Sequence, residues 1–294
     1  MIVLLRLGAL VAQRQSGGRL AEAEGDLPST DGGGNSADRL DDAVCVVEGG
    51  LRFELDLTRG EHIGLFFDSR PARGLVRSLA AGRRVLNLFA YSGGMCAPRP
   101  PHTHRHPFRK GPSVNRCSRG VAAAAGGALS TTNVDNKLTF LKLAERNYAL
   151  NKLPVDSRTF CCEDAVRFMK TAVRDSWRRY GLIILDPPPK FGRNRKQSEW
   201  EFDASQHFGQ LLGLALQLLD GPGSVILAGF PCTAGHSDKD GFEEMVAEAQ
   251  TIAGVAIRRK PTVWPAEDFP FCPHRPTARF FVAELGEASG CKKD

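Results

Sequence analysis

The sequence predicts an α/β fold: a doubly wound, mostly parallel seven-stranded sheet with a short N-terminal β-hairpin. Two observations carry this prediction. From residue 83 onward, hydrophobic runs with strand propensity alternate with segments of helical periodicity, a pattern typical of parallel sheets. The first run, Val85 to Phe89, leads into Gly93-Gly94, as a buried strand does where it enters a glycine loop. Ligands of such sheets bind at the carboxyl ends of the strands.

The other elements follow from the same periodicity. Loose alternation around Gly49-Gly50 predicts the hairpin. Further strands are expected at 128–134, 157–162, 181–185, 224–230, 254–259 and 278–285. Helices are expected at 71–81, 137–151, 164–179, 200–219 and 238–252. The proline-rich loop before the last strand favours a closing antiparallel hairpin.

These elements divide the chain into four parts. Residues 1–44 are expected to be a disordered N-terminal segment, and 45–82 to form the hairpin and a lead-in helix. Residues 83–286 form the main domain, and 287–294 form a tail.

Residues 97–120 interrupt the pattern where the first crossover helix should run. They are rich in proline, which does not fit a helix interior, so we expect a disordered basic insertion or an untranslated segment included in the sequence. The formal net charge of +6 is contained in this segment, so the charge alone does not indicate a nucleic-acid partner. His102, His104 and His106 invite a metal-binding interpretation, but a solvated loop without metal is the expectation.

Composition limits the class of protein. No stretch reaches the roughly 18 apolar residues of a membrane span. The eight cysteines form no C-x-x-C pair, which favours reduced thiols in an intracellular enzyme. Residues 1–21 are basic and lack acids, and Arg6 breaks their short apolar stretch, so they make a poor secretory signal. The expected compartment is therefore the cytoplasm, or an organelle if this segment is a transit peptide.

Acidic residues follow two further strands. Asp135 closes the second strand, where a carboxylate can accept both hydroxyls of a ribose. Asp164 closes the third, where it could receive an adenine amino group. Each acid could equally be a helix N-cap. A nicotinamide-dependent dehydrogenase would share the glycine loop and the first acid, so these two features alone do not identify the cofactor.

The fourth strand ends in Asp186-Pro187-Pro188. Proline cannot continue a strand ladder, so the chain must turn here and expose backbone carbonyls. This ending is similar to the motif of adenosylmethionine-dependent methyltransferases that act on nucleobases. In those enzymes the acid and carbonyls bind the ring nitrogen and exocyclic amine of an extruded base. Hydride transfer has no role for such a motif, which disfavours a dehydrogenase.

Four segments together resemble the bacterial large-subunit rRNA methyltransferases, which modify cytosine C5 or guanine N7. They are Val-Leu-Asn-Leu-Phe-Ala-Tyr-Ser-Gly-Gly (85–94), Val-Asp (134–135), Ala-Glu-Arg-Asn-Tyr-Ala-Leu-Asn (144–151) and Leu-Asp-Pro-Pro (185–188). The segment from Gly64 to Arg70 also resembles the family's cofactor-contacting lead-in. The likeness covers about residues 46–285 without the insertion. It implies a class I (Rossmann-like) methyltransferase fold, S-adenosyl-L-methionine as methyl donor, and ribosomal RNA as substrate, with no membrane or metal. The resemblance assigns cofactor contacts to Phe66, Asp68, Arg70, Asn87, Phe89, Tyr91, Gly93, Asp135, Asp164, Asp186 and Pro187.

A thiol follows the fifth strand. Phe230-Pro231-Cys232-Thr233 is similar to the Phe-Ser-Cys-Ser segment of the cytosine-5 branch, whose cysteine is the nucleophile. Cytosine C5 becomes nucleophilic only after a thiolate adds to C6, and Asp186 would steady N3 during this addition. Asp268-Phe-Pro270 also resembles an Asp-His-Pro segment of that branch. By this resemblance Cys232 and Asp186 are the catalytic residues.

The resemblance has departures that leave alternatives open. Cytosine-5 members carry an N-terminal RNA-binding domain, where this sequence has only a short segment before the hairpin, and Pro231 replaces a serine. RNA would contact Pro188, Lys190 and Arg193, although a solvated basic loop fits the same residues. The alternatives are nitrogen methylation of a base, of the guanine-N7 type, and a non-catalytic RNA- or partner-binding module disabled by the insertion.

Overall fold

The structure, a computed structural model, has a seven-stranded sheet at its centre. It describes residues 11–14, 43–56, 65–90, 118–176, 179–188, 190–191, 202–232, 241–268 and 277–287. The strand order is β11-β12-β10-β7-β4-β5-β6, and β12 runs antiparallel to both of its neighbours while the other pairs are parallel. The predicted doubly wound, mostly parallel sheet is therefore confirmed.

The strands of this sheet lie close to their predicted positions. They are β4 (Arg84–Leu88), β5 (Ser130–Asp135), β6 (Phe160–Cys162), β7 (Leu182–Leu185), β10 (Val225–Cys232), β11 (Ile257–Val263) and β12 (Thr277–Leu285). Strand β11 begins three residues later than predicted because Gly254, with a left-handed φ of 65°, ends the preceding helix.

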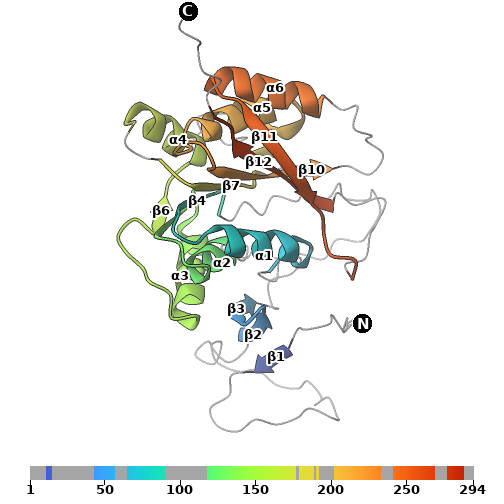
Figure 1. Ribbon diagram of the computed structural model, residues 1–294. Helices are drawn as coiled ribbons and strands as arrows, with labels where there is room; N and C mark the ends of the chain where they lie inside the picture. Colours follow the sequence, from blue (N-terminus) through green and yellow to red (C-terminus); the bar gives the residue numbers. More distant parts are fainter. Residues whose placement is uncertain are drawn as a thin grey trace, which may run out of the picture.

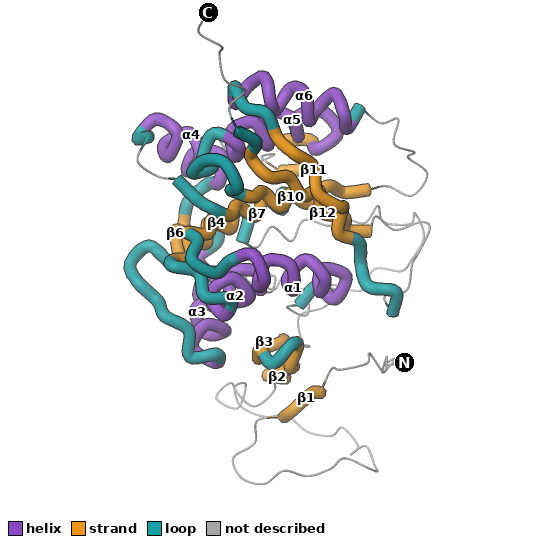
Figure 2. The backbone as a smooth tube through the Cα atoms, viewed as in Figure 1, coloured by secondary structure: helices purple, strands orange, loops and turns teal. Residues whose placement is uncertain are grey.

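Helices cover both faces of the sheet (Figures 1 and 2). The helices α1 (Arg70–Leu79), α2 (Ser118–Ala125) and α3 (Leu138–Leu150) lie on one side, with the 3-10 turn η2 (Phe67–Ser69) before α1. The helices α4 (Ala165–Arg174), α5 (Ala204–Leu216) and α6 (Phe242–Ala253) lie on the other. All four side chains of β7 are buried, with Leu182 and Ile184 in the core beneath α1 and α2, and Ile183 and Leu185 in the opposite core. A strand buried on both faces explains the continuous apolar run.

Three helices are clearly shorter than the sequence predicts. Helix α6 begins at Phe242, not at residue 238. Helix α4 ends at Arg174, not at residue 179. Helix α5 begins at Ala204, not at residue 200, because β9 (Phe202–Asp203) pairs with β8 (Lys190–Phe191) in a small antiparallel ribbon. No helix in the described part of the chain is long and apolar enough to cross a bilayer.

The N-terminal hairpin is present and gains a strand. Strands β2 (Ala43–Glu48) and β3 (Leu51–Asp56) are joined by Gly49-Gly50, whose φ angles of 57° and 80° suit a two-residue turn. Strand β1 (Val11–Arg14) pairs with β2, although the sequence assigns it to the disordered segment.

Helix α3 holds the hairpin through two asparagines. Asn147 Oδ1 accepts a hydrogen bond from Glu54 N at 2.8 Å. Asn151 accepts from Arg52 N and donates to Arg52 O at 2.8 and 2.7 Å. Both asparagines belong to the 144–151 segment that carries the family resemblance. Their spacing of one helical turn puts both amides beside β3, where they pair backbone groups along this strand.

Helix α2 begins inside the predicted insertion. The sequence assigns residues 118–120 to that insertion, whereas the structure buries them in the first turn of α2. A Cβ on Gly120 would come closer than 3.0 Å to Asn133 Oδ1. Glycine therefore lets the helix approach β5, and residues 97–117 lie outside the described residues.

Candidate cofactor and nucleobase site

The carboxyl edge of the sheet gathers most of the predicted site residues. Phe89 follows β4, Asp135 closes β5, and Asp186 follows β7. The register pairs Leu88 with both Val134 and Leu185, so these three strands end side by side. Tyr91, Gly93 and Arg193 lie outside the described residues.

For two further site residues the backbone is described. Cys232 is the last residue of β10 and pairs with Thr277 of β12. Lys190 pairs with Asp203 in the ribbon that follows the Asp-Pro-Pro turn. Because β10 is the sheet neighbour of β7, Cys232 lies at the same edge of the sheet as Asp186.

Asp186 lies in a row across three strands. The register places Gly229 of β10 beside Asp186 and opposite Phe280 of β12. Side chains two positions apart on a strand point to the same face of the sheet. Asp186 therefore points, like Leu182 and Ile184, to the face that α1 and α2 cover. The side chain is 13% exposed, and Pro187 and Pro188 are buried. The predicted acid is therefore a largely enclosed group at the sheet edge.

A buried arginine completes this row. Arg119 Nη2, from the first turn of α2, donates to Asp186 Oδ2, and the Arg119 side chain is 3% exposed. Its guanidinium carbon lies 4.9 Å from the centre of the Phe280 ring. The remaining donors Nε and Nη1 have no hydrogen-bond partner among the described residues. Sequence reasoning missed Arg119 because it assigned this residue to the insertion.

Asp164 and Asp135, the two other predicted acids, accept hydrogen bonds from the backbone. Asp164 is the N-cap of α4 and accepts from Val166 N and Arg167 N, both at 3.0 Å. This is the N-cap alternative that the sequence left open. Asp135 is buried, and its Oδ1 accepts from Lys137 N at 2.9 Å, which fixes the turn into α3.

Asn87 lies in the interior and not at the edge. It is 1% exposed, and its amide donates to Asn133 Oδ1 at 2.9 Å. Asn133 donates in turn to Tyr148 Oη and Thr159 O. Phe89 begins the turn after β4 with a φ of 52°, which is uncommon for a bulky side chain.

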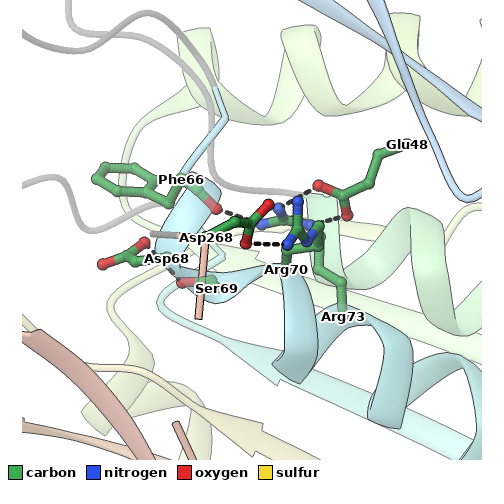
Figure 3. Close-up of polar contacts among 7 residues, drawn as sticks. All are labelled: Glu48, Phe66, Asp68, Ser69, Arg70, Arg73 and Asp268. Carbon is green, nitrogen blue, oxygen red and sulfur yellow. Dashed lines mark hydrogen bonds and ion pairs between the residues drawn. The ribbon is translucent and has the colours of Figure 1, made fainter. Parts of the chain in front are cut away.

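The lead-in segment is held by two arginines (Figure 3). Arg73 is buried, and it binds both carboxylate oxygens of Glu48 at 2.7 and 2.6 Å and the carbonyl of Phe66 at 2.7 Å. Arg70 pairs with Asp268, in the loop after β11. The close-up shows Phe66, Asp68 and Arg70 in one short stretch, where Asp68 accepts a hydrogen bond from Ser69 Oγ at 3.3 Å.

Within the ranges that the structure describes, no three His, Cys, Asp or Glu side chains form a group that could hold a metal. His102, His104 and His106 lie outside those ranges. Cys45, Cys161 and Cys162 are free thiols.

Sequence comparison matches a family of S-adenosylmethionine-dependent methyltransferases over residues 28–99. A large-subunit rRNA methyltransferase K/L from Shewanella is 34% identical over 199 residues, covering 67% of this chain and 24% of that protein. A large-subunit rRNA methyltransferase I from Serratia proteamaculans is 31% identical over 209 residues, covering 71% of this chain and 45% of that protein. The chain therefore spans less than half the length of these curated relatives.

Solved structures share the fold. A methyltransferase-like protein crystallised with SAH superposes with a TM-score of 0.65 and 22% identity, covering 85% of this chain and 57% of that one. An S-adenosylmethionine-dependent methyltransferase from Agrobacterium tumefaciens superposes with a TM-score of 0.57 and 20% identity, covering 85% and 72%. These likenesses confirm the predicted class I architecture.

Proposed function

We propose that this chain is an S-adenosylmethionine-dependent methyltransferase and that it methylates a base of ribosomal RNA. The observation that carries the proposal is Asp186, enclosed at the carboxyl edge and followed by two buried prolines. An acid and rigid carbonyls at this position suit the polar edge of an extruded base. The named relatives act on large-subunit rRNA, which supports the same class of substrate.

The neighbouring strand ends suit the cofactor S-adenosylmethionine. Asp135 closes the strand beside β4, the position of a ribose-binding acid. Arg119 offers buried donors that need an acceptor. When bound, the cofactor supplies an electrophilic methyl group on a sulfonium. The residues at these strand ends would hold the base and the adenosine of the cofactor.

The favoured target atom is cytosine C5, with Cys232 as nucleophile. Its place at the end of β10, at the same sheet edge as Asp186, supports this assignment. The Cys232 thiolate would form a bond to C6, and C5 would then accept the methyl group that the bound cofactor supplies, with S-adenosylhomocysteine as the leaving group. Loss of the C5 proton and of the thiolate restores the ring. Asp186 holds the N3 edge during these steps.

The test is methylation of protein-free large-subunit rRNA by the full chain, with nucleosides identified by mass spectrometry. We expect 5-methylcytidine, its loss in Cys232→Ala, and its retention in the control Cys161→Ala, because Cys161 is on β6, three strands from β7. RNA that contains 5-fluorocytidine should trap a covalent adduct, because the fluorine atom takes the place of the C5 proton that the final elimination must remove.

Other outcomes would favour the alternatives. If 7-methylguanosine formed and Cys232→Ala kept full activity, the reaction would be nitrogen methylation. RNA binding without methylation, together with no binding of S-adenosylmethionine, would favour a non-catalytic module.

A further inference from the structure

Arg119 has unused hydrogen-bonding capacity in a buried place. Its side chain is 3% exposed, one nitrogen donates to Asp186, and Nε and Nη1 have no partner among the described residues. Leaving charged donors buried and unpaired is costly, so native proteins rarely do so without a functional reason. Such donors suit a hydrogen-bond acceptor that is not among the described residues, and a bound ligand can supply one.

The surroundings of Arg119 restrict what that acceptor can be. The Phe280 ring covers one face of the guanidinium, and Asp186 fixes its Nη2 edge. The free N–H groups are therefore held in set directions in the plane of the guanidinium. Arg119 also lies in the first turn of α2, where the helix dipole favours a negative group.

Charge balance points to a zwitterion. Arg119 and Asp186 form a neutral pair at a largely buried position. A lone anion there would add net charge to a region of low dielectric, which is unfavourable. A group with a carboxylate for the guanidinium and an ammonium of its own leaves the enclosed site neutral. The amino-acid end of S-adenosylmethionine has this chemistry.

We propose that Arg119 binds the carboxylate of the methionine portion of S-adenosylmethionine. This inference rests on the proposed function, because it concerns the cofactor of that reaction. An RNA phosphate would be the competing acceptor. The burial of Arg119 disfavours a phosphate, because an extruded base can enter this enclosed place while the phosphates of its strand stay outside it.

The test is calorimetric titration of three adenosine ligands into the full chain. S-adenosylmethionine has the carboxylate, its decarboxylated form lacks that group alone, and 5′-methylthioadenosine lacks the whole amino-acid end. We expect the wild type to bind S-adenosylmethionine about 10- to 100-fold more tightly than the decarboxylated form, the range for a hydrogen bond to a charged group. In Arg119→Gln this preference should disappear, while affinity for 5′-methylthioadenosine stays within about twofold.

Clear results would overturn the inference. Equal affinity of the wild type for the carboxylated and decarboxylated ligands would exclude a carboxylate contact without any variant. An unchanged preference in Arg119→Gln would assign the carboxylate to another residue. Loss of RNA affinity with unchanged cofactor affinity would assign Arg119 to a phosphate. If no adenosine ligand bound the wild type, the proposed function itself would fail.

Folding needs its own control because Arg119→Gln leaves Asp186 without its charged partner. Thermal unfolding of the variant shows whether it is native at the temperature of titration. Should it not fold, Arg119→Lys keeps the positive charge but offers fewer, differently placed donors. We expect this variant to fold and to retain only part of the preference, and full retention would contradict the inference.

Discussion

Gly229 and Asp186 lie side by side on neighbouring strands, and the absence of a side chain on the first makes room for the carboxylate of the second. A Cβ on Gly229 would come closer than 3.0 Å to Asp186 Oδ1 and to 3.1 Å from Phe280 Cε1. On its other side the carboxylate meets Arg119. Asp186 is therefore held by a bare strand position and a buried guanidinium, and its orientation depends on both.

Gly229→Ala should displace the Asp186 carboxylate. A methyl group in this packed row forces a shift, and overpacking of this kind costs about 1–3 kcal/mol in unfolding free energy. We expect a lower melting temperature, weaker binding of S-adenosylhomocysteine in calorimetry, and reduced methylation. The control is Gly74→Ala on α1, where nothing lies within 4 Å of the added Cβ. Wild-type affinity and activity in Gly229→Ala would show that Asp186 does not need its observed position.

The Arg73–Glu48 pair should be a main anchor of the N-terminal sheet. Both side chains are largely buried, at 3% and 11% exposure, and Arg73 also binds the Phe66 carbonyl. Arg73→Met leaves Glu48 buried without a partner, which should cost about 3–5 kcal/mol in urea unfolding. Because the Phe66 carbonyl is released too, cofactor affinity should fall.

The matched control for this prediction is an exposed ion pair. Arg84 and Asp220 are 48% and 51% exposed, so Arg84→Met should change the unfolding free energy by less than about 1 kcal/mol. Equal effects of Arg73→Met and Arg84→Met would contradict the assignment of Arg73 as an anchor.

Local signals in the sequence predict the sheet well and mark the end of β7 at Asp186. Asp186 is recognisable because two prolines end its strand, and the hairpin because Gly49-Gly50 suits a tight turn. Contacts between distant segments are different in kind. Arg70 and Asp268 are 198 positions apart, and no local pattern relates them. Gly229 lies within an apolar strand, and nothing in its local sequence shows that it makes room for Asp186. That role follows only from the pairing of β10 with β7.

There is also a physical reason why the sequence does not predict the position of Arg119 in a helix. Helix periodicity before Val121 is obscured by the proline-rich segment, so the first turn of α2 has no signal of its own in the sequence. In the structure residues 118–120 are buried, with Gly120 against Asn133 of β5 and Arg119 against Asp186 and Phe280. For Asp164, local sequence allowed two roles, and the hydrogen bonds establish the capping role without testing the other.

Asp164→Ser separates those two roles. Serine keeps an oxygen for the N–H groups of Val166 and Arg167, so the melting temperature should stay near the wild type. The shorter side chain cannot reach an adenine amino group, so affinity for S-adenosylhomocysteine should fall about tenfold, a change of 1.4 kcal/mol. Asp164→Ala is the capping control and should lose about 0.5–2 kcal/mol of stability. Unchanged affinity in the serine variant would leave Asp164 as a cap alone.

The pKa of the Cys162 thiol should depend on the charge of Asp135. Burial raises the pKa of Cys162 above its ordinary value, and the neighbouring Asp135 carboxylate raises this pKa further. The folded protein therefore holds the thiol proton more tightly than the unfolded chain. Stability from this group is present below the unfolded thiol pKa and is lost as pH rises through and above it.

Asp135→Asn removes the charge but keeps an oxygen for Lys137 N. We expect the pKa of Cys162 to fall and its alkylation by iodoacetamide at pH 8 to become faster, because the thiolate is the reactive form. Cys45 is the internal control: its pKa is raised by burial, with charges from Arg52 and Glu54 and not from Asp135. Peptide mass spectrometry resolves the two sites. An unchanged rate at Cys162, or an equal increase at Cys45, would mean that Asp135 does not act on this thiol through its charge.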